Sequence, residues 1–149
     1  MVIITIGGKM ENMKDFVDYA IMGILGLMSF VSLWLGIERY FFYRSINLSE
    51  YKTKNKVEIA LTRNLSTIST IGANAPYVGL LGTVIGIMIV FYDMGVSSSF
   101  DTAAIVVGLS LALKATAFGI AVAIFSMIFY STYLRKSDVL LGEWEDEIN

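Results

Sequence analysis

The chain has 149 residues, of which 56% are hydrophobic and 16% are charged, and its mean hydropathy is +0.68. This composition is far from that of a soluble domain of the same length and indicates a membrane protein. The sequence contains neither cysteine nor histidine, so it offers no disulfide, no thiolate or imidazole metal site and no histidine base. Its net charge of −2 gives no indication of nucleic-acid binding. We therefore expect no metal and no cofactor.

The chain begins with a segment of mixed polarity, residues 1–18. It does not resemble a cleaved signal peptide, because its apolar part is short and charged residues follow it. From Met13 onward, apolar residues recur at helical spacing, which predicts an amphipathic helix that enters the membrane from its outer interface. The part before Met10 is equally consistent with a disordered leader. The first spanning helix follows at residues 19–38, and its bulky side chains make it the expected lipid-facing helix.

Residues 39–70 are predicted to form a connector that is partly helical. From Val57 to Ile71 the apolar residues keep a three-to-four spacing, which predicts a helix that runs on into the second span. The second span covers residues 71–92 and contains the only proline of the sequence, Pro76. This proline either occupies the first helical turn or kinks a longer helix, and the sequence leaves both alternatives open.

A loop at residues 93–101 leads to the third span at residues 102–134, which is longer than a bilayer is thick and is expected to project from it. An acidic tail, residues 135–149, follows. The connector and the start of the tail carry many lysines and arginines, whereas the 93–101 loop has none. Since basic loops stay in the cytoplasm, we expect the N-terminus and this loop to lie outside, and the connector and tail inside.

The predicted fold is thus an all-α integral membrane protein with three transmembrane helices, of which the second and third are long and extend into the cytoplasm. Small residues on these two spans predict close packing, because they let helix backbones approach one another in a membrane. A compact three-helix hairpin with no further role explains the small residues equally well. The expected contact residues are Gly79, Gly82, Gly86, Ala112, Ala115 and Gly119.

One charge, Lys114, lies in the middle of the third span, where placing a lysine costs at least ~2.5–3.5 kcal/mol. No acidic residue lies within the predicted spans to neutralise it, since Glu38, Asp93 and Asp101 lie at their ends. The lysine either borders a pore or pairs with an acidic group of another chain, or it snorkels toward the headgroups. The sequence leaves these alternatives open.

Two strings carry a resemblance to a known family: "APYVGLLGTVIGIMIVF" at residues 75–91 and "ALKATAFGIAVAI" at residues 112–124. Together with the three-span topology, they resemble the second-helix and third-helix signatures of the ExbB/TolQ family, relatives of the flagellar stator protein MotA. The similarity covers about residues 61–133. It implies a ring of identical subunits in the bacterial inner membrane, with a pentamer as the expected form, whose second and third helices line a central pore.

The resemblance also implies partners. A smaller protein, ExbD or TolR, inserts single membrane helices into the ring, and proton flow moves these helices and so drives TonB or TolA. No covalent chemistry is involved, so the chain is not expected to be an enzyme.

By motif position the resemblance makes Thr83 and Thr116 the two pore-facing threonines, although on the residues alone each would bond the carbonyl four residues earlier. Many relatives carry a glutamate where this chain has Leu111, so we expect the titratable group to come from the partner. Lys114 lies one turn from Leu111, so bordering the pore and meeting the partner's aspartate is one alternative for it, and snorkelling toward the headgroups is the other.

Three functions are consistent with the sequence. The first is an ExbB-like subunit that energises TonB-dependent uptake across the outer membrane, and the second is a TolQ-like subunit of the Tol-Pal envelope-integrity motor. The third is a structural or ion-leak membrane oligomer without a motor partner. Membrane lipid and further copies of the chain are expected contacts in all three, and nucleic acid in none.

Overall fold

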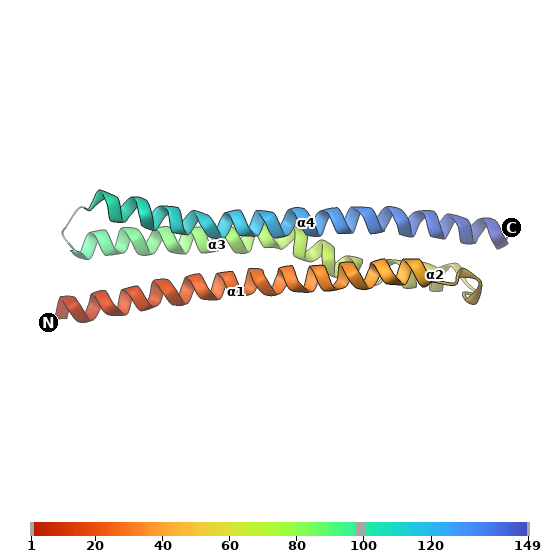
Figure 1. The fold of residues 1–149 in the computed structure, drawn as a ribbon, viewed down its shortest axis with the longest axis horizontal. Helices are drawn as coiled ribbons and strands as arrows, with labels where there is room; N and C mark the ends of the chain where they lie inside the picture. The colour runs from red at the N-terminus through yellow and green to blue at the C-terminus, as the bar shows by residue number, and fades with distance from the viewer. Residues whose placement is uncertain (1, 98–100, 149) are drawn as a thin grey trace.

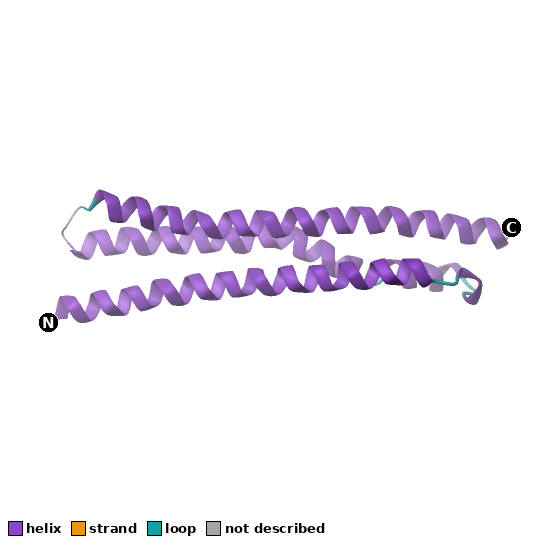
Figure 2. Ribbon diagram, in the orientation of Figure 1, coloured by secondary structure: helices purple, strands orange, loops and turns teal. Residues whose placement is uncertain are grey.

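The computed structural model describes residues 2–97 and 101–148, and within them every regular element is helical (Figures 1 and 2). The elements in chain order are α1 (Val2–Ser45), the 3₁₀-helix η1 (Leu48–Glu50), α2 (Lys54–Thr62), α3 (Leu65–Ser97) and α4 (Thr102–Ile148). Three of these helices contain segments long and apolar enough to span a membrane. The prediction of an all-helical protein with three apolar spans is therefore confirmed. Residues 98–100 of the predicted outer loop lie outside the described residues.

The three long helices run side by side (Figure 1). The start of α1 lies at the same end of the bundle as the end of α3 and the start of α4, whereas α2 and the end of α4 lie at the opposite end. An ion pair between Lys14 of α1 and Asp93 of α3 joins two helices at the first end. At ~1.5 Å per residue, α4 with its 47 residues is ~70 Å long, more than twice the thickness of a bilayer core. A bilayer core of about 30 Å would therefore enclose less than half of the length of α4.

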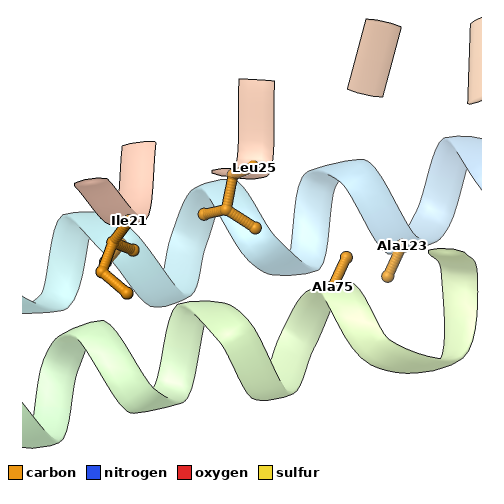
Figure 3. Packing of buried hydrophobic residues seen from close by; sticks show 5 residues of the cluster. Ile21, Leu25, Ala75 and Ala123 are labelled. Carbon is orange, nitrogen blue, oxygen red and sulfur yellow. The ribbon is translucent and has the colours of Figure 1, made fainter. Parts of the chain in front are cut away.

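The three long helices meet through two branched residues of α1 and small residues of α3 and α4 (Figure 3). The buried members of this cluster are Ile21, Leu25, Ala75, Ala115 and Ala123. Nearby, the hydroxyls of Ser32 in α1 and Ser126 in α4 share a buried hydrogen bond of 2.7 Å. Because lipid is as apolar as these side chains, close packing and interhelical hydrogen bonds are what stabilise the contact.

A second core joins α1, α2 and α4 at the opposite end of the bundle. Its buried residues are Tyr43, Val57, Leu61 and Trp144. The Trp144 indole N–H donates a 3.1 Å hydrogen bond to the carbonyl of Tyr51, just before α2. Burial of this tryptophan explains why the predicted tail at 135–149 stays helical and continuous with α4 through Ile148.

The helix predicted to run from Val57 into the second span is broken in the structure. It ends as α2 at Thr62 and resumes as α3 at Leu65. Between them, Asn64 has a φ of 65°, a left-handed conformation that asparagine adopts more readily than most residues. The spacing of apolar residues could not reveal this break, because the apolar stripe continues on both sides of it.

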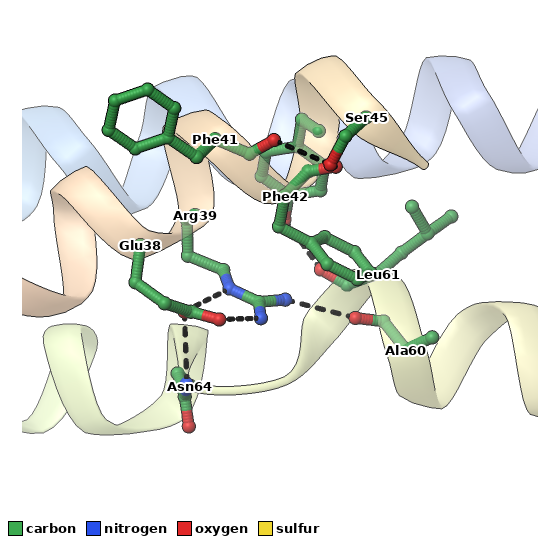
Figure 4. Close-up of polar contacts among 9 residues, drawn as sticks. Glu38, Arg39, Phe41, Phe42, Ser45, Ala60, Leu61 and Asn64 are labelled. Carbon is green, nitrogen blue, oxygen red and sulfur yellow. Dashed lines mark hydrogen bonds and ion pairs between the residues drawn. The ribbon is translucent and has the colours of Figure 1, made fainter. Parts of the chain in front are cut away.

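Side chains of α1 cap the last carbonyls of α2, which have no partner within their own helix. The Arg39 guanidinium donates to the carbonyl of Ala60 at 3.0 Å and to the adjacent Glu38 carboxylate at 2.7 and 2.5 Å (Figure 4). The same carboxylate accepts a 3.2 Å bond from the Asn64 side chain. The Tyr43 hydroxyl donates to the carbonyl of Leu61 at 2.5 Å. The break between α2 and α3 is thus held by polar groups of α1.

Pro76 lies inside α3, well beyond its first turn at Leu65. Of the two alternatives left open by the sequence, the structure shows the proline within a longer helix. Its missing N–H leaves the carbonyl of Gly72 without the usual intrahelical donor.

Candidate functional site

The candidate site is the contact between α3 and α4, where glycines bring the two backbones together. A Cβ added to Gly119 would lie 2.5 Å from the carbonyl oxygen of Ala75, and one added to Gly79 would lie 2.6 Å from that of Ala115. Real Cβ atoms essentially never approach so closely, and here the obstacle is backbone that cannot rotate away. Any side chain larger than hydrogen at these two positions would push the helices apart.

The remaining small residues of the predicted contact meet farther along the same line. A Cβ on Gly82 would lie 2.9 Å from the Cβ of Ala115, and one on Gly86 would lie 2.8 Å from the Cβ of Ala112. Within one chain, the structure therefore brings together all six residues that the sequence singled out for packing.

Thr83 and Thr116 meet at this contact. Their hydroxyl oxygens are 2.5 Å apart, and the Thr83 hydroxyl also lies 3.0 Å from the carbonyl of Ala112 in α4 and 3.3 Å from that of Gly79 in its own helix. The bond to the carbonyl four residues earlier is thus the longest of the three. A hydroxyl carries one proton, so Thr83 can donate to one carbonyl while accepting from Thr116.

The two threonines differ in how accessible they are. Thr83 is 7% exposed, whereas Thr116 is half-buried. On α3, the neighbouring Gly82 faces Ile21 of α1, and consecutive residues on a helix point about 100° apart. Thr83 therefore lies on a different side of α3 from α1, and its recorded partners all belong to α3 and α4.

Lys114 and Leu111 lie elsewhere on α4. Both side chains are exposed, and among the described residues no ion pair of Lys114 is recorded. Lys114 precedes Thr116 by two residues, which places it about 200° around the helix. The lysine and the threonine pair thus occupy nearly opposite sides of α4.

Two polar features escaped the sequence analysis. One is the Ser32–Ser126 hydrogen bond, for which the available signal was the pair of serines, Ser29 and Ser32, in the otherwise apolar first span. The other is a groove of about 380 Å³ between the start of α3 and α4, most of whose lining residues carry hydroxyls. The groove is lined by Thr62, Leu65, Ser66, Ser69, Thr70, Tyr130 and Leu134.

Comparison with known proteins gives a consistent result. The sequence profile of the MotA/TolQ/ExbB proton channel family matches residues 34–146. The chain is 54% identical to a biopolymer transport protein ExbB of Helicobacter pylori strain J99, over 90% of this chain and 92% of that protein. It is 51% identical to an ExbB of Aquifex aeolicus, over 91% and 92% of the two chains. A Tol-Pal system protein TolQ of Pseudomonas aeruginosa is 36% identical over 60% of this chain and 39% of its own length.

Proposed function

Because the chain belongs to the MotA/TolQ/ExbB proton channel family, we propose that it is an ExbB-like subunit of an inner-membrane motor driven by the proton-motive force. In this proposal identical copies form a ring, with the N-terminus and the 93–101 loop in the periplasm. An ExbD-type protein places its single membrane helix in the ring, and the resulting movement reaches TonB and energises uptake across the outer membrane. The chain serves transport and carries out no covalent chemistry.

Two of the similarities favour the ExbB role over the TolQ role. The ExbB relatives match nearly the whole of both chains at 51% and 54% identity. The TolQ relative matches only 39% of its own length, at 36% identity. A Tol-Pal role, with TolR and TolA as partners, is the second candidate.

The observation that carries the proposal is the Thr83–Thr116 hydrogen bond between α3 and α4, whose recorded partners all belong to these two helices. If Thr83 donates to the carbonyl of Ala112, then Thr116 donates to Thr83, and the lone pairs of the more accessible Thr116 remain free. Those lone pairs can accept a hydrogen bond from a protonated carboxyl group. Thr116 would thus accept a hydrogen bond from the aspartate of the partner, while Thr83 would orient the Thr116 hydroxyl by accepting its proton in a hydrogen bond.

This arrangement is tested by removing the hydroxyls at nearly constant shape. We expect Thr116→Val, alone or combined with Thr83→Val, to leave the oligomer intact by native mass measurement and to abolish energised uptake in cells that lack their own ExbB. Thr116→Ser keeps the hydroxyl and should retain uptake. The control is Thr70→Val, because among the described residues the recorded bond of the Thr70 hydroxyl goes to the carbonyl of Ser66 in its own helix. Normal uptake in the double variant would contradict the proposal.

A further inference from the structure

The end of the bundle that carries α2 and the C-terminus has an ordered arrangement of charge. The short helix α2 runs antiparallel to the end of α4, and an ion pair between Lys54 and Glu145 fixes their register. Moving two residues along α2 from Lys54 leads to Lys56, and moving two residues back along α4 from Glu145 leads to Glu143. Each step is ~3 Å in the same direction along the bundle, so Lys56 and Glu143 lie at the same level.

These two residues nevertheless do not face each other within one chain. A step of two residues rotates a side chain by about 200°, so each lies on the side of its helix opposite to the Lys54–Glu145 pair. Both are exposed, and no ion pair of either is recorded among the described residues. One flank of the bundle end thus presents a lysine of α2, and the opposite flank presents a glutamate of α4.

An exposed apolar residue accompanies each charge. Ile59 follows Lys56 by three positions on α2 and is 69% exposed, while Val139 precedes Glu143 by four positions on α4 and is 54% exposed. Both pairs have the spacing of neighbours on one helix face. In the register fixed by the Lys54–Glu145 pair, Ile59 and Val139 also lie at nearly the same level.

We propose that these flanks are the two halves of a contact between neighbouring copies of this chain, with Lys56 and Ile59 of one subunit against Glu143 and Val139 of the next. This inference rests on the proposed ring. Rotation about an axis parallel to the helices keeps every residue at its level, and a cyclic ring joins two different surfaces head to tail. The two flanks are different, complementary in charge, matched in level and on opposite sides of the subunit, as such a ring requires.

Because the chain has no cysteine, the contact can be tested by cross-linking. We expect the double variant Ile59→Cys/Val139→Cys, checked first for an intact oligomer by native mass measurement, to give covalent multimers up to the full ring on oxidation. Each single variant should give none, because position 59 meets only position 139. The control Lys54→Cys/Glu145→Cys should cross-link within one chain and give no multimers.

A second measurement tests the charges. Lys56→Glu should weaken the association of subunits about two- to fivefold per boundary, and adding Glu143→Lys to the same chain should restore it. An intact ring whose 59/139 variant forms no multimers would overturn this inference and leave the proposed function standing. A wild-type chain that is monomeric in lipid nanodiscs would overturn both.

Discussion

Lys114 is an ionisable group in the apolar middle of α4, where its charge is costly. Since Lys114 lies about 200° around the helix from Thr116, its side chain and the threonine pair are on nearly opposite sides of α4. Two roles remain: snorkelling along the surface of α4, or pairing with the partner's aspartate from the far side of the helix.

We expect Lys114→Met to retain energised uptake and partner binding, because the geometry separates this residue from the proposed contact of Thr116. Lys114→Met and wild type are each tested with the unchanged partner and with a partner whose aspartate is changed to asparagine. Co-purification measures partner binding, and an uptake assay measures energy coupling. Loss of partner binding in Lys114→Met, with no further loss when the aspartate is also changed, would establish the pairing role.

Arg39 is a second charge with a large structural role, since its side chain is 1% exposed and caps α2 from α1. Arg39→Met would leave the Ala60 carbonyl without its side-chain donor, and the Glu38 carboxylate would keep the bond from the Asn64 side chain but lose both bonds from the guanidinium. We expect the free energy of unfolding in detergent to fall by about 1–3 kcal/mol. The exposed Arg44, on the same helix, serves as control, and Arg44→Met should change stability by less than about 0.5 kcal/mol. Equal effects of the two changes would contradict the capping role.

At the scale of helices, the distance between α3 and α4 depends on their glycines. Gly86→Leu and Gly119→Leu should separate the two helices and prevent ring formation, because the added atoms would meet Ala112 and the Ala75 carbonyl. Gly26→Leu is the matched control, since a Cβ there has nothing within 4 Å, and Phe30→Leu should be tolerated on an exposed side of α1. The oligomeric state of each variant is measured by native mass measurement. An intact oligomer with Gly86→Leu and Gly119→Leu would contradict this account.

Composition and spacing predicted the three apolar helices, because a membrane span is set by length and hydropathy along the chain. They could not predict where α1 and α2 end. The charges at Glu38 and Arg39 mark the end of an apolar run, yet α1 continues to Ser45. What keeps it helical and breaks the chain at Asn64 are contacts with residues far along the sequence, such as Arg39 with the Ala60 carbonyl. The Thr83–Thr116 bond likewise depends on the rotation of two helices, which periodicity alone does not give.

For the whole molecule, the distribution of basic residues predicts one orientation. A cysteine introduced by Ser98→Cys, between α3 and α4, should be labelled in intact cells by a thiol reagent that cannot cross the membrane. A cysteine introduced by Lys54→Cys should be labelled only after the cells are opened. The cysteine-free chain is its own background control. Labelling of position 54 in intact cells would reverse the orientation.

The unbroken length of α4 has a mechanical consequence. The only proline of the chain is in α3, so α4 passes from Thr116 to Trp144 without one. Over this distance of ~42 Å, a tilt of about 5° at the threonine would move the tryptophan sideways by ~4 Å. The displacement of α4 thus grows with distance along the helix and is large at its end, which packs against α1 and α2. In α3, the proline provides a point at which the helix can bend. A displacement of α4 in the membrane would therefore be amplified at Trp144, and strain would be taken up in α3.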